Sequence, residues 1–187
     1  MTPDADIPPS FEEFEAIAID RVSGLTPDLD AGAFSLAFNV IRLANRMVAD
    51  LETEVHSEAG WSWAGFRILF AVLVHGELEP REISRLSDVT RASVSSVLNT
   101  LERDGLVVRL RESEDRRLVT VRLTELGSRK IVEAFAAHNA RESKWSSVLT
   151  ESERQQLTSL VRKVLDGGPG NGAKLTTGTG QREWSGP

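Results

Sequence analysis

The sequence predicts a mainly α-helical protein that carries one small β-wing of two or three strands. Apolar side chains recur every three or four residues before position 105 and again after position 125, which is the spacing of amphipathic helices. Between these regions, residues 107–111 and 118–123 form two runs rich in β-branched side chains, separated by the charged segment ESEDRR. Two such runs around a polar tip predict a β-hairpin.

Helical spacing predicts seven helices, over residues 11–22, 33–59, 63–74, 80–86, 90–104, 125–145 and 150–165. The first is short and amphipathic, the second has a broad apolar stripe that needs a partner, and the third is apolar on nearly all sides and should be central. Pro80 suits a first helical turn, and Thr90 is a good N-cap. Gly105 suits a helix end, and Thr150 opens a capping box.

Composition places the chain among globular proteins and limits its chemistry. The 187 residues are 40% hydrophobic and 27% charged, with a net charge of −6 and no cysteine. The absence of cysteine excludes disulfides, thiolate nucleophiles and Cys-ligated metals. Residues 1–60 carry 3 basic and 12 acidic side chains, whereas residues 81–122 carry 9 basic and 7 acidic. We therefore expect any basic face in the middle of the chain.

Several classes of protein are disfavoured. No apolar stretch is long enough for a membrane span, and the acidic, Pro-rich start MTPDADIPPS is unlike a signal peptide, so we expect a cytoplasmic protein. The chain has no nucleophile elbow, no HExxH motif and no phosphate-binding loop. We therefore expect that the protein is not an enzyme and that it holds no cofactor and no metal. Seven of the 14 glycines fall within residues 166–187, which predicts a flexible tail.

The middle of the chain has the element order of a winged helix-turn-helix. A short helix, a tight turn, a capped helix with a small polar outer face and a basic hairpin follow one another. An α-helix fits the major groove of B-DNA, and small side chains let its backbone approach the bases. Arg91 can reach a guanine or a phosphate, and Asn99 a phosphate or an adenine. The hairpin tip would place a guanidinium near the narrow minor groove.

The segment TRASVSSVLNTLERDGLVVRLRESEDRRLVTVRLTELG, residues 90–127, resembles the DNA-binding core of the MarR family of bacterial transcription regulators. The capped TRASVS helix and the DRR wing tip followed by VRLTELG carry the resemblance, which extends over roughly residues 33–165. It implies a homodimer with interlocked terminal helices, two winged lobes on a palindrome, and often a small aromatic acid or phenol as effector.

The resemblance assigns the recognition helix to residues 90–104 and the wing tip to Arg116 and Arg117, one of which Asp115 would orient by charge-assisted hydrogen bonds. The recognition-helix residues it turns toward DNA are Arg91, Ser93, Ser95 and Ser96. Many relatives have a phosphate-binding arginine where this chain has Ser96, which suggests weaker binding or a different register.

The helix at 11–22 is similar to the additional N-terminal helix of the urate-responsive branch. That branch has an acidic pocket residue where Arg67 stands, and a tryptophan in its first helix that this chain lacks, so we do not expect urate as the effector. Arg67 favours an anionic ligand, or pairs with Glu58, Glu77 or an acid of a partner chain.

The aromatic residues around position 67 have two interpretations. Trp63, Phe66 and Phe70, together with Trp61, can wall an effector pocket or form plain core. His56 and His75 could serve an effector or metal site, but without an acidic cluster nearby we expect them at the surface.

The predicted organisation is an N-terminal extension (1–32), a dimerisation region (33–60 and 125–165), a DNA-binding lobe (61–124) and a tail (166–187). The predicted function is a ligand-responsive repressor that binds a palindromic operator in double-stranded DNA as a homodimer. The alternative is a helical interaction module that oligomerises without binding DNA. A steep fall of affinity with salt would distinguish the two.

Overall fold

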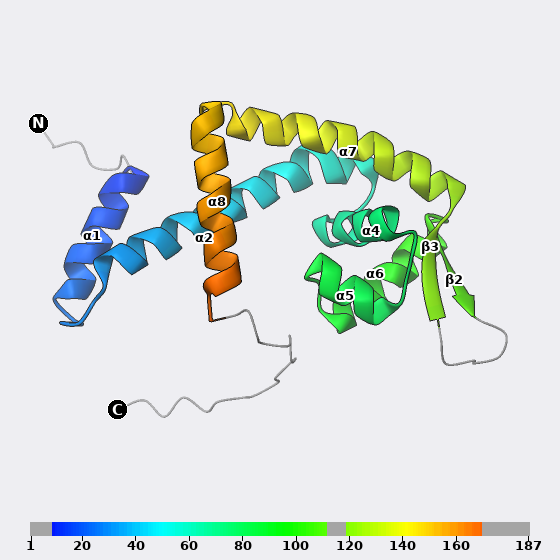
Figure 1. Ribbon diagram of the computed structural model, residues 1–187, viewed down its shortest axis with the longest axis horizontal. Helices are drawn as coiled ribbons and strands as arrows, with labels where there is room; N and C mark the ends of the chain where they lie inside the picture. Colours follow the sequence, from blue (N-terminus) through cyan, green and yellow to red (C-terminus); the bar gives the residue numbers. More distant parts are fainter. Residues whose placement is uncertain (1–8, 112–118, 170–187) are drawn as a thin grey trace, which may run out of the picture. The chain divides into compact units, whose positions relative to one another are not determined.

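The computed structural model describes residues 9–111 and 119–169 (Figure 1). The helices are α1 (Phe11–Ser23), α2 (Ala31–Leu51), the π-helical segment η1 (Glu52–His56), α3 (Ser57–Ala59), α4 (Trp63–His75), α5 (Pro80–Ser87), α6 (Arg91–Arg103), α7 (Glu125–Ser146) and α8 (Glu151–Gly167). The strands are β1 (Glu77–Leu78), β2 (Val107–Arg111) and β3 (Val119–Leu123). The predicted class, mainly helical with a small sheet, is confirmed. The chain divides into an N-terminal unit up to Ala49 and a C-terminal unit from Asp50, which are described separately.

In the N-terminal unit, α1 packs on α2 through one carboxylate and a row of aromatic rings. Glu15 of α1 accepts hydrogen bonds from the Ser35 hydroxyl and from Asn39 Nδ2, the latter at 2.7 Å. These hydrogen bonds lower the pKa of Glu15. The rings of Phe14 and Phe38 stack with centroids 6.0 Å apart. The predicted helix at 11–22 is confirmed and forms a helical hairpin with α2.

In the C-terminal unit, α4 is central, as its apolar sequence predicts. Ile68, Leu69 and Val72 on α4 are fully buried. The cluster around them includes Ile83 of α5, Val94, Leu98 and Leu101 of α6, Val107 and Val121 of the sheet, and Ile131 of α7. Because every element of the lobe contributes to this cluster, truncating one of its leucines to alanine should cost about 2–5 kcal/mol.

The sheet has the order β1-β3-β2, with both pairs antiparallel. Val107 pairs with Leu123 across the predicted hairpin, and Leu78 of β1 pairs with Val121. The sequence analysis expected two or three strands but did not locate the third, β1. Its two residues are too few to show the alternation of apolar and polar side chains that marks a strand. The hairpin tip, with Asp115, Arg116 and Arg117, lies outside the described residues.

The start of α7 is fastened to the turn between α6 and β2. Thr124 is the N-cap of α7, and its Oγ1 accepts from the backbone N–H of Gly127 at 2.9 Å. The same threonine donates from its N–H to the Leu106 carbonyl at 3.0 Å and from Oγ1 to the Gly105 carbonyl at 2.6 Å. The direction in which α7 leaves the lobe is therefore set by hydrogen bonds as well as by apolar packing.

At the other end of α7, a carboxylate clamp joins it to the end of α2. Asp50 accepts from Arg141 Nε at 2.6 Å and from Trp145 Nε1 at 2.7 Å, and Glu54 lies 3.6 Å from Arg141 Nη1. Hydrogen bonds from Arg141 and Trp145 lower the pKa of Asp50 to about 2.

The expectation that His56 lies at the surface is wrong. His56 is the last residue of η1 and has no exposed surface, because α4 and α7 cover it with aromatic side chains. His138, on α7, is buried beside it. His75, at the end of α4, is exposed as expected.

The last described helix, α8, begins with the predicted capping box of Thr150 and Glu153 and ends at Gly167, two residues beyond the predicted end. Its apolar residues are exposed in the single chain, namely Leu157, Leu160, Val161, Val164 and Leu165. Within residues 9–111 and 119–169, no helix combines the length and the apolar composition needed to cross a bilayer.

Candidate nucleic-acid interface

The turn between α5 and α6 is tight and internally hydrogen-bonded. Asp88 takes the left-handed conformation with φ of 48°, which reverses the chain between the helices. The buried Ser84 hydroxyl donates to the Val89 carbonyl at 2.7 Å, and the buried Ser87 hydroxyl donates to the Ile83 carbonyl at 2.6 Å. The two serine hydroxyls thus donate to backbone carbonyls at the end of α5 and in the turn, where the helical hydrogen-bond pattern stops.

The turn is followed by α6, whose two ends are fixed by the predicted residues. Thr90 Oγ1 accepts from the backbone N–H of Ser93 at 3.2 Å, as an N-cap does. At the other end Gly105 has φ of 69°, and the N–H of Leu106 donates to the Leu101 carbonyl at 2.8 Å. This is a Schellman ending, which glycine adopts without steric cost.

The outer face of α6 is small and polar. Val94, Leu98 and Leu101 point into the core, and the exposed positions include Arg91, Ser93, Ser95, Ser96 and Asn99. The structure therefore brings the predicted recognition residues onto one solvent-facing surface. Ser93 is partly committed to the cap, since its Oγ lies 2.9 Å from Thr90 Oγ1.

An ion-paired network that the sequence analysis missed ties α6 to β2. Arg109, on β2, donates from Nη1 to Glu102 Oε2 at 2.6 Å and from Nη2 to Asn99 Oδ1 at 2.8 Å. Because arginine only donates hydrogen bonds, the oxygen of Asn99 must face it. Asn99 thus holds the hairpin against the helix and presents its two amide N–H groups to another partner. The spacing of Asn99 and Glu102, three residues apart on one helix, indicates that they share a face. No pattern in the sequence indicates that Arg109 of β2 binds both of them.

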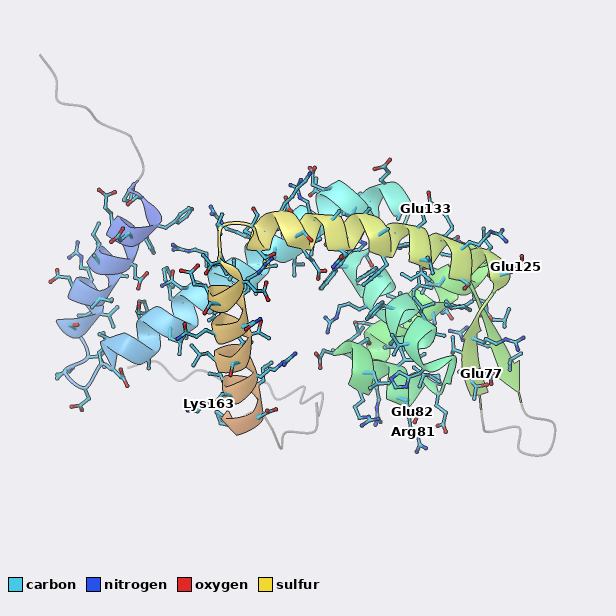
Figure 2. The ribbon with its side chains drawn as sticks, turned by 45° about the horizontal axis from the view of Figure 1, so that its top comes forward. Glu77, Arg81, Glu82, Glu125, Glu133 and Lys163 are labelled. Atoms are coloured by element: carbon cyan, nitrogen blue, oxygen red, sulfur yellow. The ribbon has the colours of Figure 1, made fainter. Side chains whose placement is uncertain are left out.

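Three arginines from three elements border one concavity of about 410 Å³. Its lining residues are Pro80, Arg81, Arg91, Ser95, Leu98, Asn99, Arg109 and Val119. Arg81 projects from the first turn of α5 (Figure 2) and pairs with Glu79 at 2.8 Å. Among the described residues, no carboxylate forms an ion pair with Arg91. The charge of Arg91 is therefore available to an anion on this face.

The residues predicted for an effector pocket lie together and pack on one another. The rings of Trp63 and Phe66 stack with centroids 5.6 Å apart, and those of Phe66 and Phe70 are 5.9 Å apart. This stacking favours the core interpretation. Arg67 forms an ion pair with Asp88 at 3.4 Å, so the expectation of Glu58 or Glu77 as its partner is wrong. The sequence did not reveal this pair because it depends on the left-handed turn at Asp88.

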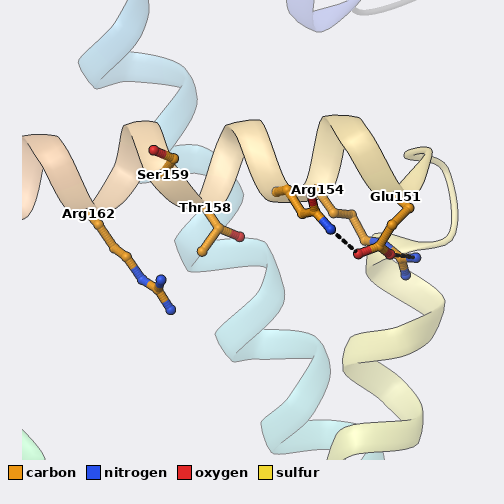
Figure 3. A pocket seen from close by; sticks show the side chains of 6 residues that line it. Glu151, Arg154, Thr158, Ser159 and Arg162 are labelled. Atoms are coloured by element: carbon orange, nitrogen blue, oxygen red, sulfur yellow. Dashed lines mark hydrogen bonds and ion pairs between the residues drawn. The ribbon is translucent and has the colours of Figure 1, made fainter.

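A second concavity, of about 450 Å³, is lined only by residues of α8 (Figure 3). Arg154 Nη2 and Gln155 Nε2 both donate to Glu151, at 2.5 and 2.8 Å. Because a single helix supplies the whole lining and Glu151 is already paired with Arg154 and Gln155, we assign no ligand to it. In the part of the chain that the structure describes, no group of three or more His, Asp or Glu residues is placed to hold a metal ion.

A helix-turn-helix on a small antiparallel sheet defines a winged helix-turn-helix lobe. The sequence profile of the MarR family matches residues 61–118. An HTH-type transcriptional regulator of Bacillus subtilis, YwaE, is 38% identical over 138 residues, which are 74% of this chain and 81% of that protein. The chain belongs to the MarR family of transcriptional regulators.

Two solved structures share the fold. A mutant of Escherichia coli MarR in complex with operator DNA has a TM-score of 0.66 and 23% identity, over 74% of this chain and 99% of that one. BpsR of Bordetella bronchiseptica, whose DNA binding is regulated by 6-hydroxynicotinic acid, has a TM-score of 0.64 and 23% identity, over 71% and 99%.

Proposed function

We propose that this protein regulates transcription by inserting α6 into the major groove of DNA, with the hairpin tip following the adjacent minor groove. The observation that carries the proposal is the outer face of α6, where small serines surround an arginine that has no ionic partner among the described residues. Such a face permits close approach to the bases and places a positive charge beside the phosphates. The fold shared with a MarR structure bound to operator DNA supports it.

The proposal gives the exposed residues different tasks. Arg91 binds a phosphate or a guanine edge, while Ser95 and Ser96 line the approach to the bases. Asn99 offers its amide N–H groups to a phosphate or a base acceptor, since its oxygen is held by Arg109. Arg116 and Arg117, supported by Asp115, enter the minor groove from the hairpin tip, which lies outside the described residues.

We further propose that two copies form a homodimer on a palindromic operator. The exposed apolar residues on α8 form a face that a single chain leaves in water, at a cost of about 25 cal/mol for each Å² that a partner would cover. α2 also exposes Leu36, Val40 and Ile41. A twofold-symmetric pair of lobes reads half-sites about one helical turn, or ~34 Å, apart.

A dimer seated on a promoter would exclude polymerase and so act as a repressor. Release by a small aromatic or anionic effector is part of the proposal, supported by BpsR, whose DNA binding 6-hydroxynicotinic acid regulates. Such a ligand acts only through a difference in its affinity for the DNA-bound and free conformations. Because Arg67 is already paired with Asp88, an anionic effector at that position must compete with this carboxylate.

The experiment is to recover the DNA that the protein retains from cells, and then to compare specific and nonspecific binding by fluorescence anisotropy. Ser95→Trp should weaken binding to the selected sequence much more than binding to random DNA, because the bulky ring holds α6 away from the bases. Ser23→Trp, the same change at an exposed position of α1 outside the proposed interface, is the matched control. Equal losses on both DNAs would contradict a helix in the groove. Failure to bind any DNA in dilute buffer would favour the helical interaction module.

A further inference from the structure

Two buried histidines from different elements face each other in the C-terminal unit. His56 ends η1 and His138 lies in the middle of α7, and their exposed fractions are 0% and 4%. His56 Nε2 and His138 Nδ1 are 3.3 Å apart, within hydrogen-bond distance. Neither side chain takes part in the proposed DNA interface.

The neighbours of the pair determine where its protons sit. Trp61 Nε1, which can only donate, lies 3.4 Å from His56 Nδ1, so that nitrogen accepts. His56 therefore carries its proton on Nε2 and donates it to His138 Nδ1. His138 in turn carries its proton on Nε2 and donates it to Glu142 Oε1 at 3.1 Å. Trp61, His56, His138 and Glu142 form one directional relay, to which we refer as the histidine relay.

The histidine relay has no place for an additional proton. A proton on His138 Nδ1 would face the N–H of His56, and moving the His56 proton to Nδ1 would make it face the N–H of Trp61. Either arrangement sets two buried donors against each other and loses a hydrogen bond, which costs more in the interior than in water.

The surroundings reinforce this preference for the neutral state. The Phe66 ring lies 4.3 Å from His56 and 4.4 Å from His138, and Trp63 stacks on His138 at 5.8 Å. Burial, and to a smaller extent the neighbouring His138, lowers the pKa of His56 from 6.5 to about 4.

Of the charged groups around the relay, Glu142 and Lys130 of α7 contact its members, and the others pair elsewhere or are exposed. Glu52 of η1 accepts from the N–H of Trp63 at 3.2 Å, and Arg141 of α7 is held by Asp50 and Glu54. Glu58 of α3 is exposed. On α4, Arg67 lies over Trp63 at 5.9 Å and pairs with Asp88. Two charges therefore touch the relay directly, the carboxylate of Glu142 at His138 and the ammonium of Lys130, whose Nζ lies 5.7 Å from the centre of the Trp61 ring.

The histidine relay closes the junction between η1 and α7. The backbone N–H of Trp61 also donates to the His56 carbonyl at 3.1 Å. Trp61, which lies just before α4, is thus bound to His56 through both its backbone and its side chain. On the other side, α7 is fastened to the α6–β2 turn through Thr124. A change at the relay is thereby connected to both sides of the lobe that carries α6.

We propose that the histidine relay is a proton-sensitive switch, in which uptake of one proton breaks the relay, loosens the junction between η1 and α7, and lowers the affinity for DNA. This regulation rests on the proposed function. An open junction that restores the pKa of His56 from about 4 to 6.5 would gain about tenfold in population over the closed one between pH 7.5 and pH 5.5. DNA affinity should fall by up to the same factor.

The test follows the histidine imidazole resonances by NMR and the DNA affinity by anisotropy, in the 187-residue chain over pH 7.5 to 5 at constant ionic strength. The chain has three histidines, and His75→Gln identifies the exposed one and serves as the control. Glu142→Gln keeps an acceptor for the His138 Nε2–H but removes the negative charge beside the relay, so the midpoints of the histidine titration and of the DNA affinity should both move to lower pH. Trp61→Phe removes the indole N–H that faces His56 Nδ1, so His56 can be protonated there without a clash of donors. The midpoints of the histidine titration and of the DNA affinity should both move to higher pH.

The outcomes separate the two proposals. If the buried histidines titrate and the DNA affinity follows them, with opposite shifts in Glu142→Gln and Trp61→Phe, the switch is supported. If the midpoints are the same in all variants, or the DNA affinity ignores the titration, the switch is refuted although DNA binding stands. If no DNA is bound even at pH 7.5, the proposed function fails, and the regulation fails with it whatever the histidines do.

Discussion

Replacing Gly127 with alanine should destabilise the protein although the position is helical. In an exposed helix interior, Gly→Ala usually stabilises by about 1 kcal/mol. A Cβ on Gly127 would lie 1.9 Å from the Leu106 carbonyl oxygen and 2.8 Å from its carbon, whereas Cβ contacts under 3.0 Å essentially never occur. The start of α7 and the α6–β2 turn must therefore separate by about 1.1 Å.

That separation acts on the hydrogen bonds that fasten α7. The bonds from Thr124 to the Leu106 and Gly105 carbonyls are 3.0 and 2.6 Å long and would both be stretched or lost. Strain of about 2 kcal/mol and two hydrogen bonds of about 1 kcal/mol each, offset by about 1 kcal/mol of helix propensity, give a net loss of about 3 kcal/mol.

The assay is urea unfolding followed by circular dichroism at one fixed protein concentration, because the proposed homodimer would make the apparent stability concentration-dependent. Gly167→Ala is the matched control, since a Cβ there meets nothing within 4 Å. We expect the control to be neutral or slightly more stable than the wild type. If Gly127→Ala were as stable as Gly167→Ala, the close contact between α7 and the α6–β2 turn would be refuted.

Three further substitutions test the interface and the clamp. Thr90→Ala should lower the free energy of unfolding by about 1 kcal/mol, because the N-cap of α6 is lost, and should also weaken DNA binding. Ser10→Ala, at the N-cap of α1, should lower only the stability. Equal effects of the two variants on DNA binding would contradict the role of α6. Arg109→Ala should weaken DNA binding about fivefold, because Asn99 loses its partner and the Glu102 carboxylate is left unpaired beside α6, and an unchanged affinity would contradict this role of Arg109. The pKa of Asp50 is lowered from 3.8 to about 2, so its carboxylate stabilises the folded protein fully above pH 3.8, and this contribution is lost as the pH falls through about 2. The stability of Asp50→Asn should lack this dependence on pH in acid unfolding. An acid unfolding profile identical to that of the wild type would contradict the clamp.

The features that the sequence predicted correctly have local causes. Thr90, Gly105 and Thr150 cap or end their helices through backbone groups a few residues away, so their effect can be recognised without knowing the fold. The apolar spacing of α4 likewise predicted its central position, because a helix that is apolar on nearly all sides can only be stable inside the core.

The features that the sequence missed depend on residues far apart in the chain. His56 and His138 are 82 positions apart, and His56 is buried because η1, α4 and α7 converge on it. The network of Arg109 with Asn99 and Glu102 depends in the same way on the docking of a strand against a helix. Strand β1 was not located because its two residues become a strand only through pairing with β3.

The salt dependence of DNA binding in Arg91→Ala tests the central claim most directly. If Arg91 meets a phosphate, the slope of log affinity against log salt should become shallower by about 0.9 for each arginine lost, or about 1.8 in a homodimer. Arg129→Ala is the matched control, because Arg129 is an exposed arginine of α7 that is paired with Glu125. An unchanged affinity and slope in Arg91→Ala, or equal changes in both variants, would contradict a DNA-binding face on α6, whereas a lower affinity at an unchanged slope would assign Arg91 to a base edge.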